Sequence, residues 1–270
     1  RLHVGDEVTA ALVAFVLAHE DLELQIAELT RRMECEGPSA ELYYRRAELH
    51  RLHENWSAAR EDYDRAERLD PAWAEIDLGR GRMWLGAGDP GRAEEALLRF
   101  LARRPDHAGA LLELARARRA LGRPAEAARD YARALALLPE PKPDYLLERA
   151  RAQEAAGDLD GAIKGLEEGM KRVGRIVTLE SAAMELEIAA GRLEAALARL
   201  DRLAAATPRP EVWWVRRGEV LRRAGRAAEA EAAFRAALAA LESLPPARRA
   251  VKSVRDLEVR ARAGLGIGKP

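Results

Sequence analysis

The sequence is poor in the residues that define several classes of protein. Its one cysteine, Cys35, excludes an intrachain disulfide framework and a cysteine-based zinc site, and we interpret it as a buried or inert thiol. Aromatic residues make up only 5% of the chain, and Val, Ile, Tyr, Phe and Trp are too scattered to form the strands of a sheet. Five lysines stand against 40 arginines, and with abundant alanine this composition favours helices.

A net charge is also absent, because 45 basic side chains cancel 45 acidic ones. No global field therefore attracts the protein to nucleic acid or to an anionic membrane. The longest apolar run, residues 8–18, has about half of the ~20 residues that a spanning helix needs. It fits either the remnant of a secretion signal within residues 1–18 or a first helix of the fold. The compartment, cytoplasmic or exported, stays open with this alternative.

A repeat of about 34 residues runs through most of the chain. Five glycines recur at intervals of 34, 35, 34 and 34 residues, each between two segments with helical patterning: Gly88, Gly122, Gly157, Gly191 and Gly225. An additional unit precedes them, in which Glu54 and Asn55 take the place of the glycine. The sequence therefore contains six units, each expected to be two helices joined by a tight turn.

The second helix of each unit carries a fixed pair of small and large residues. An alanine stands at the same place in all six units: Ala59, Ala93, Ala127, Ala162, Ala196 and Ala230. Four residues later comes a large side chain that fills the space the alanine leaves: Tyr63, Leu97, Tyr131, Leu166, Leu200 and Phe234. Most units end near a proline, which cannot continue a helix.

This pattern resembles the tetratricopeptide-repeat (TPR) family over residues 40–244. The family also has a small residue in its first helix, found here as Ala47, Gly81, Ala115, Ala150 and Gly218, with Met184 as the exception. The resemblance implies an all-α fold, a right-handed α-solenoid of about six helical hairpins with capping helices at its N-terminal and C-terminal ends. It also implies that Trp214 packs in the core and that Arg46 and Asp62 form an ion pair within the first unit.

The repeat frame predicts the organisation of the whole chain. Residues 1–39 supply an N-terminal helix or cap, and the six repeats occupy residues 40–73, 74–107, 108–141, 143–176, 177–210 and 211–244. A capping helix is expected over residues 245–263 and a flexible tail over 264–270. The proline-rich run at residues 139–143 coincides with the one 35-residue interval. It indicates a change in superhelical pitch, or alternatively a domain boundary.

No signature of catalysis is found. The chain has no nucleophile elbow, zinc-protease helix or dinucleotide fingerprint. His50 and His53 share a helix without a third ligand, so we expect no metal site and no cofactor. The sequence predicts a protein that is not an enzyme.

In TPR proteins the first helices of successive repeats form a concave groove that binds peptides or helices, so the resemblance places a binding site there. Arg82, Arg116 and Arg151 occupy one position in three consecutive units, with leucines beside them. These residues suit an acidic partner with intermittent apolar side chains. Alternatively, the arginines solvate a surface and pair with neighbouring acids. The candidate groove residues are Tyr44, Leu78, Arg82, Leu112, Arg116, Arg119, Leu147 and Arg151.

The predicted function is therefore a scaffold that binds a protein or peptide, or alternatively a regulatory or substrate-presenting subunit of a larger enzyme complex. Nucleic acid is not an expected partner, because single-strand binding needs exposed aromatics along the groove and only Tyr44 is available. The identity of the partner and the oligomeric state are left open.

Overall fold

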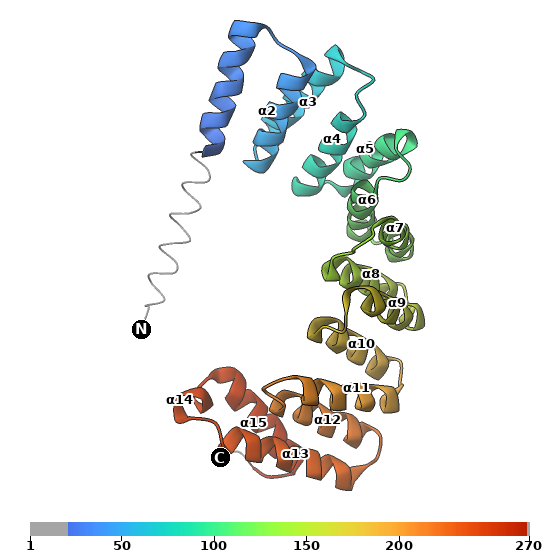
Figure 1. Ribbon diagram of the computed structural model, residues 1–270, viewed down its shortest axis with the longest axis vertical. Coiled ribbons are helices and arrows are strands. Elements are labelled where there is room, and N and C mark those ends of the chain that lie inside the picture. The colour runs from blue at the N-terminus through green and yellow to red at the C-terminus, as the bar shows by residue number, and fades with distance from the viewer. Residues whose placement is uncertain (1–20, 269–270) are drawn as a thin grey trace. The chain divides into compact units, whose positions relative to one another are not determined.

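The computed structural model describes residues 21–268, which form helices and no strand (Figure 1). The predicted all-α solenoid is confirmed. The chain divides into two compact units at the bond between Leu138 and Pro139. This division lies at the start of the proline-rich run at residues 139–143, for which a domain boundary was one of the two interpretations. The apolar run at residues 8–18 lies outside the described residues, so the two interpretations of it remain.

Unit 1 consists of a helix over residues 21–36 followed by three helical hairpins. The hairpins pair α2 (Ala40–Leu52) with α3 (Trp56–Leu69), α4 (Glu75–Gly86) with α5 (Pro90–Arg103), and α6 (Ala108–Ala120) with α7 (Pro124–Leu137). We call the first helix of each hairpin the A helix and the second the B helix. Arg46 of α2 donates to the Thr30 hydroxyl at 2.9 Å, which ties the helix over residues 21–36 to the first hairpin.

Unit 2 repeats the arrangement. Its hairpins pair α8 (Pro143–Ala155) with α9 (Leu159–Val173), α10 (Val177–Ala189) with α11 (Leu193–Ala206), and α12 (Glu211–Arg223) with α13 (Ala227–Glu242). A short helix, α14 (Pro246–Arg249), leads to α15 (Lys252–Gly264), which packs on both helices of the last hairpin.

The turns between A and B helices follow from local chemistry. All five repeat glycines have φ between 72° and 79°, a left-handed conformation that costs glycine little. In the first hairpin Glu54 takes this conformation with φ 56°, and among the described residues it is the one non-glycine that does so. Asp89 and Asp158 cap the B helices that follow them, each accepting from a backbone N–H three residues ahead.

The hairpins are closed by the predicted small and large residues. Every repeat alanine and every large residue four positions after it has at most 1% of its surface exposed. A Cβ atom added to Gly81 would lie 2.6 Å from Leu97, and one added to Gly218 would lie 2.6 Å from Phe234. Met184, which replaces the small residue in the fifth hairpin, is also buried.

Buried ion pairs join the A and B helices of several hairpins. Asp62 is 1% exposed and accepts a two-pronged hydrogen bond from Arg46 at 2.6 and 2.8 Å, so the predicted ion pair is confirmed. Arg118 of α6 pairs with Asp130 of α7 at 2.7 Å. In the fifth hairpin the equivalent positions have exchanged charge, with Glu187 on α10 and Arg199 on α11 at 2.7 Å. Arg199 also binds Glu180 and Glu167.

Three expectations differ from the structure. Cys35 is exposed and not buried, because it lies near the end of the helix over residues 21–36. The expected single helix over residues 245–263 is two helices, since Val251 has extended backbone (φ −69°, ψ 133°). Gly264, assigned to a flexible tail, ends α15 and packs so closely on Phe234 that an added Cβ would lie 2.5 Å from its ring.

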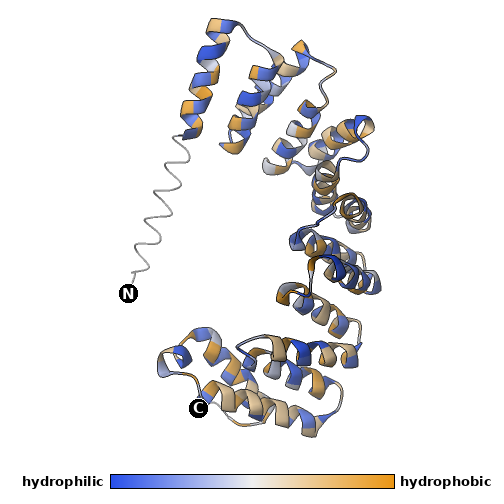
Figure 2. Cartoon of the chain, viewed as in Figure 1, coloured by the Kyte–Doolittle hydropathy of each residue, from blue (hydrophilic) through white to orange (hydrophobic). Residues whose placement is uncertain are grey.

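Hydrophilic and hydrophobic residues alternate around the helices (Figure 2). A helix of this kind buries one side against its neighbours and keeps the other in water. Between residues 21 and 268, no helix combines the length and the apolar character needed to cross a membrane.

Candidate partner-binding surface

The A helices of neighbouring hairpins contact one another, α2 with α4 and α4 with α6 in unit 1, and α8 with α10 in unit 2. In each unit, we call the surface formed by the outward side chains of its A helices, with α12 included in unit 2, the A-helix face of that unit. All eight predicted groove residues belong to these helices. Their exposure and their partners differ, and each unit is described separately.

In unit 1, Arg82 lies close to Tyr44. Burial, and then the charge of Glu48, raises the pKa of Tyr44 to about 12, while the positive charge of Arg82 works in the opposite direction. Tyr44 therefore keeps its proton near neutral pH and remains a hydrogen-bond donor. Its ring also packs on Trp73, with 4.7 Å between the ring centroids. Arg82 is half-buried, and within residues 21–268 no carboxylate forms an ion pair with it.

The other two arginines of unit 1 differ from each other. Arg116 is half-buried and pairs with Glu113, one helical turn away, at 3.2 Å. The interpretation of the arginines as charges paired with neighbouring acids therefore applies to Arg116. Arg119 is exposed, and no acid of the described chain pairs with it.

The two leucines predicted for the groove of unit 1 are buried. Leu78 and Leu112 are each 5% exposed, so they offer a partner little surface. The prediction was wrong in this respect because it took their position in the repeat as exposed. The close approach of α2, α4 and α6 covers them instead.

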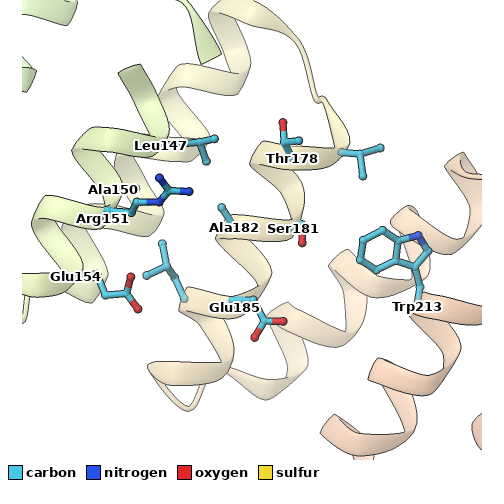
Figure 3. Close-up of a pocket in the computed structure, with 11 residues that line it drawn as sticks. Leu147, Ala150, Arg151, Glu154, Thr178, Ser181, Ala182, Glu185 and Trp213 are labelled. Carbon is cyan, nitrogen blue, oxygen red and sulfur yellow. The ribbon is translucent and has the colours of Figure 1, made fainter. Parts of the chain in front are cut away.

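In unit 2 the A-helix face contains an open pocket of about 490 Å³ (Figure 3). It lies over α10, which contributes Val177, Thr178, Ser181, Ala182, Glu185 and Leu186. Leu147, Ala150, Arg151 and Glu154 line it from α8, and Trp213 lines it from α12. The structure thus brings together two of the eight candidate groove residues, Leu147 and Arg151, with other residues of α8, α10 and α12.

The charged groups around this pocket are of two kinds. Glu185 is held by Arg216 at 3.0 Å, Arg216 also contacts Glu219 at 3.1 Å, and Arg260 of α15 binds Glu219 at 2.8 Å. Arg151 and Glu154 are exposed, and neither forms an ion pair with any residue of the described chain. Arg151 therefore offers its guanidinium group to a ligand.

Trp213 is the residue of this pocket that sequence reasoning missed. Its neighbour Trp214 was assigned to the core, and Trp214 is half-buried against the core of the last hairpins. Trp213 donates its indole N–H to the Thr207 hydroxyl at 2.8 Å, which fixes the ring at the pocket. The sequence signal that could have indicated this pocket was a pair of small residues, Ser181 and Ala182, on the A helix of the preceding unit.

His50 and His53 do not form part of a metal site in the described chain, where no group of three or more potential ligands is arranged to hold an ion. Burial lowers the pKa of His50, and its Nε2 atom lies 3.9 Å from an Asp62 oxygen. His53 Nε2 lies 3.9 Å from Glu23. Each histidine thus faces an acidic residue of a neighbouring helix, which belongs to α3 for His50 and to the helix over residues 21–36 for His53.

Paired helices with a recurring small–large contact, stacked through successive A helices, define an α-solenoid repeat protein. The tetratricopeptide-repeat family model matches residues 44–108, 78–141, 112–172 and 183–245, well over half of the chain. The chain belongs to the TPR family, whose repeats generally form non-catalytic scaffolds for protein interaction. No curated protein matches the sequence.

Solved structures of TPR proteins share the fold. A TPR protein from Parabacteroides merdae has a TM-score of 0.54 at 17% identity, covering 95% of this chain and 98% of its own. PilF from Pseudomonas aeruginosa has a TM-score of 0.55 at 17% identity, covering 75% and 91%. YrrB, a TPR protein with an unusual peptide-binding site, has a TM-score of 0.56 at 19% identity, covering 67% and 92%. At these identities the likeness concerns the fold alone.

Proposed function

We propose that this protein is a non-catalytic scaffold that binds a segment of a partner protein along its A-helix face. The observation that carries the proposal is the open pocket of unit 2, where Arg151 lies beside Leu147 with no carboxylate of the described chain to neutralise it. An apolar pocket with a few polar groups is the usual form of a ligand site, and its ~490 Å³ volume is within the ordinary range.

The chemistry favours an acidic partner with intermittent apolar side chains. A guanidinium group holds a carboxylate through two parallel hydrogen bonds, and each bond to a charged group contributes about 1.5 to 3 kcal/mol. Arg82 and Arg119 in unit 1 and Arg151 in unit 2 are available for this, whereas Arg116 would have to exchange Glu113 for the partner.

The proposal is tested by capturing partners from an extract of the source cells and identifying them by mass spectrometry. Three baits are compared: the wild-type chain, a groove variant with Arg82→Gln, Arg116→Gln and Arg151→Gln, and a control variant with Arg60→Gln, Arg68→Gln and Arg129→Gln. The control arginines are exposed on B helices and have no acidic partner in the described chain. A partner retained by the wild type and the control but lost from the groove variant supports the proposal, and equal capture by all three contradicts it.

A further inference from the structure

The pocket over α10 arises from one position of the repeat. In the first four units this position holds a large side chain, namely Tyr44, Leu78, Leu112 and Leu147 in turn. In the fifth unit the same position holds Ser181, followed by Ala182. The small side chain of Ser181 therefore leaves open, over α10, a position that a large side chain takes in the first four units, and we call this opening the hollow over Ser181.

Two apolar side chains face each other across this hollow, and one of them is fixed by a hydrogen bond. Leu147 lies on the α8 side and Trp213 on the α12 side (Figure 3). The Trp213 indole N–H is already bonded to Thr207, so the indole needs no polar partner from a ligand and its ring presents apolar surface to the pocket. A rim already held in place costs less side-chain entropy on binding than one that must be ordered.

The charged residues that line the pocket indicate which charge a ligand would carry next to its apolar group. Glu185, which also lines the pocket, is already paired with Arg216. Arg151 has no such pairing in the described chain, so it is the cation open to a ligand at this site. The complement of this arrangement is a large apolar group with a carboxylate close to it.

We infer that the hollow over Ser181 binds one large apolar side chain, aromatic or branched aliphatic, of an extended partner segment whose neighbouring carboxylate pairs with Arg151. The inference rests on the proposed function and specifies its ligand. Ser181 is the residue that determines specificity, because any larger side chain there would occupy the space of the ligand. Aromatic side chains bury about 150 to 250 Å² each and commonly dominate such contacts.

The test selects ligands from a phage library of random 12-residue peptides, using the full 270-residue chain as the target. Affinities of the selected peptides are then measured for the wild type, for Ser181→Leu and for Ser57→Leu, a matched substitution at an exposed position of a B helix. Circular dichroism checks that each variant keeps its helices. Ser181 is only half-buried, so leucine there leaves the hairpin core untouched.

We expect the selected peptides to share a large apolar residue next to Asp or Glu. Their affinity falls by about 30-fold or more in Ser181→Leu, and equally when the apolar residue of the peptide becomes alanine, but it is unchanged in Ser57→Leu. Arg151→Gln removes the preference for the acidic neighbour.

Other results overturn the inference and are distinguishable from failure of the proposed function. Peptides that bind wild type and Ser181→Leu equally, while losing affinity for the groove variant, contradict the hollow and leave the proposed function standing. Failure to select any peptide contradicts both. A wild-type dimer in sedimentation equilibrium that Ser181→Leu dissociates assigns the hollow to a second copy of the chain, which also overturns the inference.

Discussion

At the scale of single residues, the turns of the hairpins show what each position requires. Five of the six turns place glycine in the left-handed region, and the first places Glu54 there at φ 56°. A residue with a Cβ atom pays roughly 1 to 2 kcal/mol in this conformation. Among the repeat turns of the described chain, the first is therefore the one in which the side chain, that of Glu54, is disfavoured by the left-handed backbone conformation.

Replacing Glu54 with glycine should stabilise the protein. The relief of steric conflict exceeds the extra chain entropy that glycine loses on folding, so the expected gain is up to about 1 kcal/mol. Urea unfolding followed by circular dichroism measures it. The reverse change at an equivalent turn, Gly88→Ala, should lower the unfolding midpoint, and a lower midpoint for Glu54→Gly would contradict the assignment of the turn.

His50 predicts a dependence of stability on pH. Burial lowers its pKa in the folded protein below the ordinary 6.5, although Asp62 partly opposes this. The unfolded chain then binds protons more readily, so the stabilising contribution of His50 is complete above pH 6.5 and is lost as pH falls below 6.5 and through the lower pKa of the folded protein. Urea midpoints at pH 7.5 and 5.5 should differ less in His50→Gln than in the wild type. If the midpoint changes equally between the two pH values in the wild type and in His50→Gln, His50 is not the cause of the pH dependence.

Residue-scale features were predictable where sterics alone decide them. The alanine and glycine positions follow from the period, because a hairpin with tight turns and close helices permits nothing larger there. The role of Trp213 was not predictable, since both adjacent tryptophans pack on the core of the last hairpins and only Trp213 also lines the pocket over α10.

At the scale of helices, the contact between A and B helices of one hairpin holds each repeat together. Ala127 of α7 is fully buried in this contact. Ala127→Leu should therefore lower the free energy of unfolding by about 1 to 3 kcal/mol through overpacking. Thermal unfolding of the variant is the measurement, and an unchanged melting temperature would mean that the repeat frame is wrong.

The buried ions of the fifth hairpin carry a larger effect. Arg199 is 2% exposed, and two of the carboxylates it holds, Glu180 and Glu187, are 5% and 4% exposed. Arg199→Met leaves Glu187 buried without a cation and leaves Glu180 with only the exposed Arg175 and Arg202, so we expect a loss of about 3 to 5 kcal/mol. Arg235→Met, which removes an exposed pair with Glu231, should cost at most about 1 kcal/mol. Similar urea midpoints for the two variants would contradict this account.

This cluster illustrates why helix-scale reasoning from sequence was incomplete. A third of the chain is charged, so any one acid or arginine is indistinguishable from a solvated one by its spacing. Arg199 becomes buried only because three acids from α9 and α10 converge on it. The helices and their order were predictable from the period, whereas the partners of each charge required the structure.

At the scale of the molecule, the repeat frame identified the A helices as the surface to examine, but it did not distinguish among the positions on that surface. Leu78 and Leu112 are covered by neighbouring A helices, Arg116 has an acid beside it, and Leu147 and Arg151 line an open pocket. These differences depend on the side chains that approach from the next repeat. One unit of the sequence therefore cannot reveal them.

The central claim is that arginines of the A-helix face hold an acidic partner segment. Titration calorimetry of a selected peptide against the wild type and the variant with Arg82→Gln, Arg116→Gln and Arg151→Gln tests it most directly. Glutamine keeps helix propensity and most of the side-chain stem, so the fold should survive, as circular dichroism can verify. We expect affinity to fall by about 100-fold or more at low salt, and wild-type affinity to weaken as salt rises. Equal affinities of wild type and variant at low salt would contradict the claim.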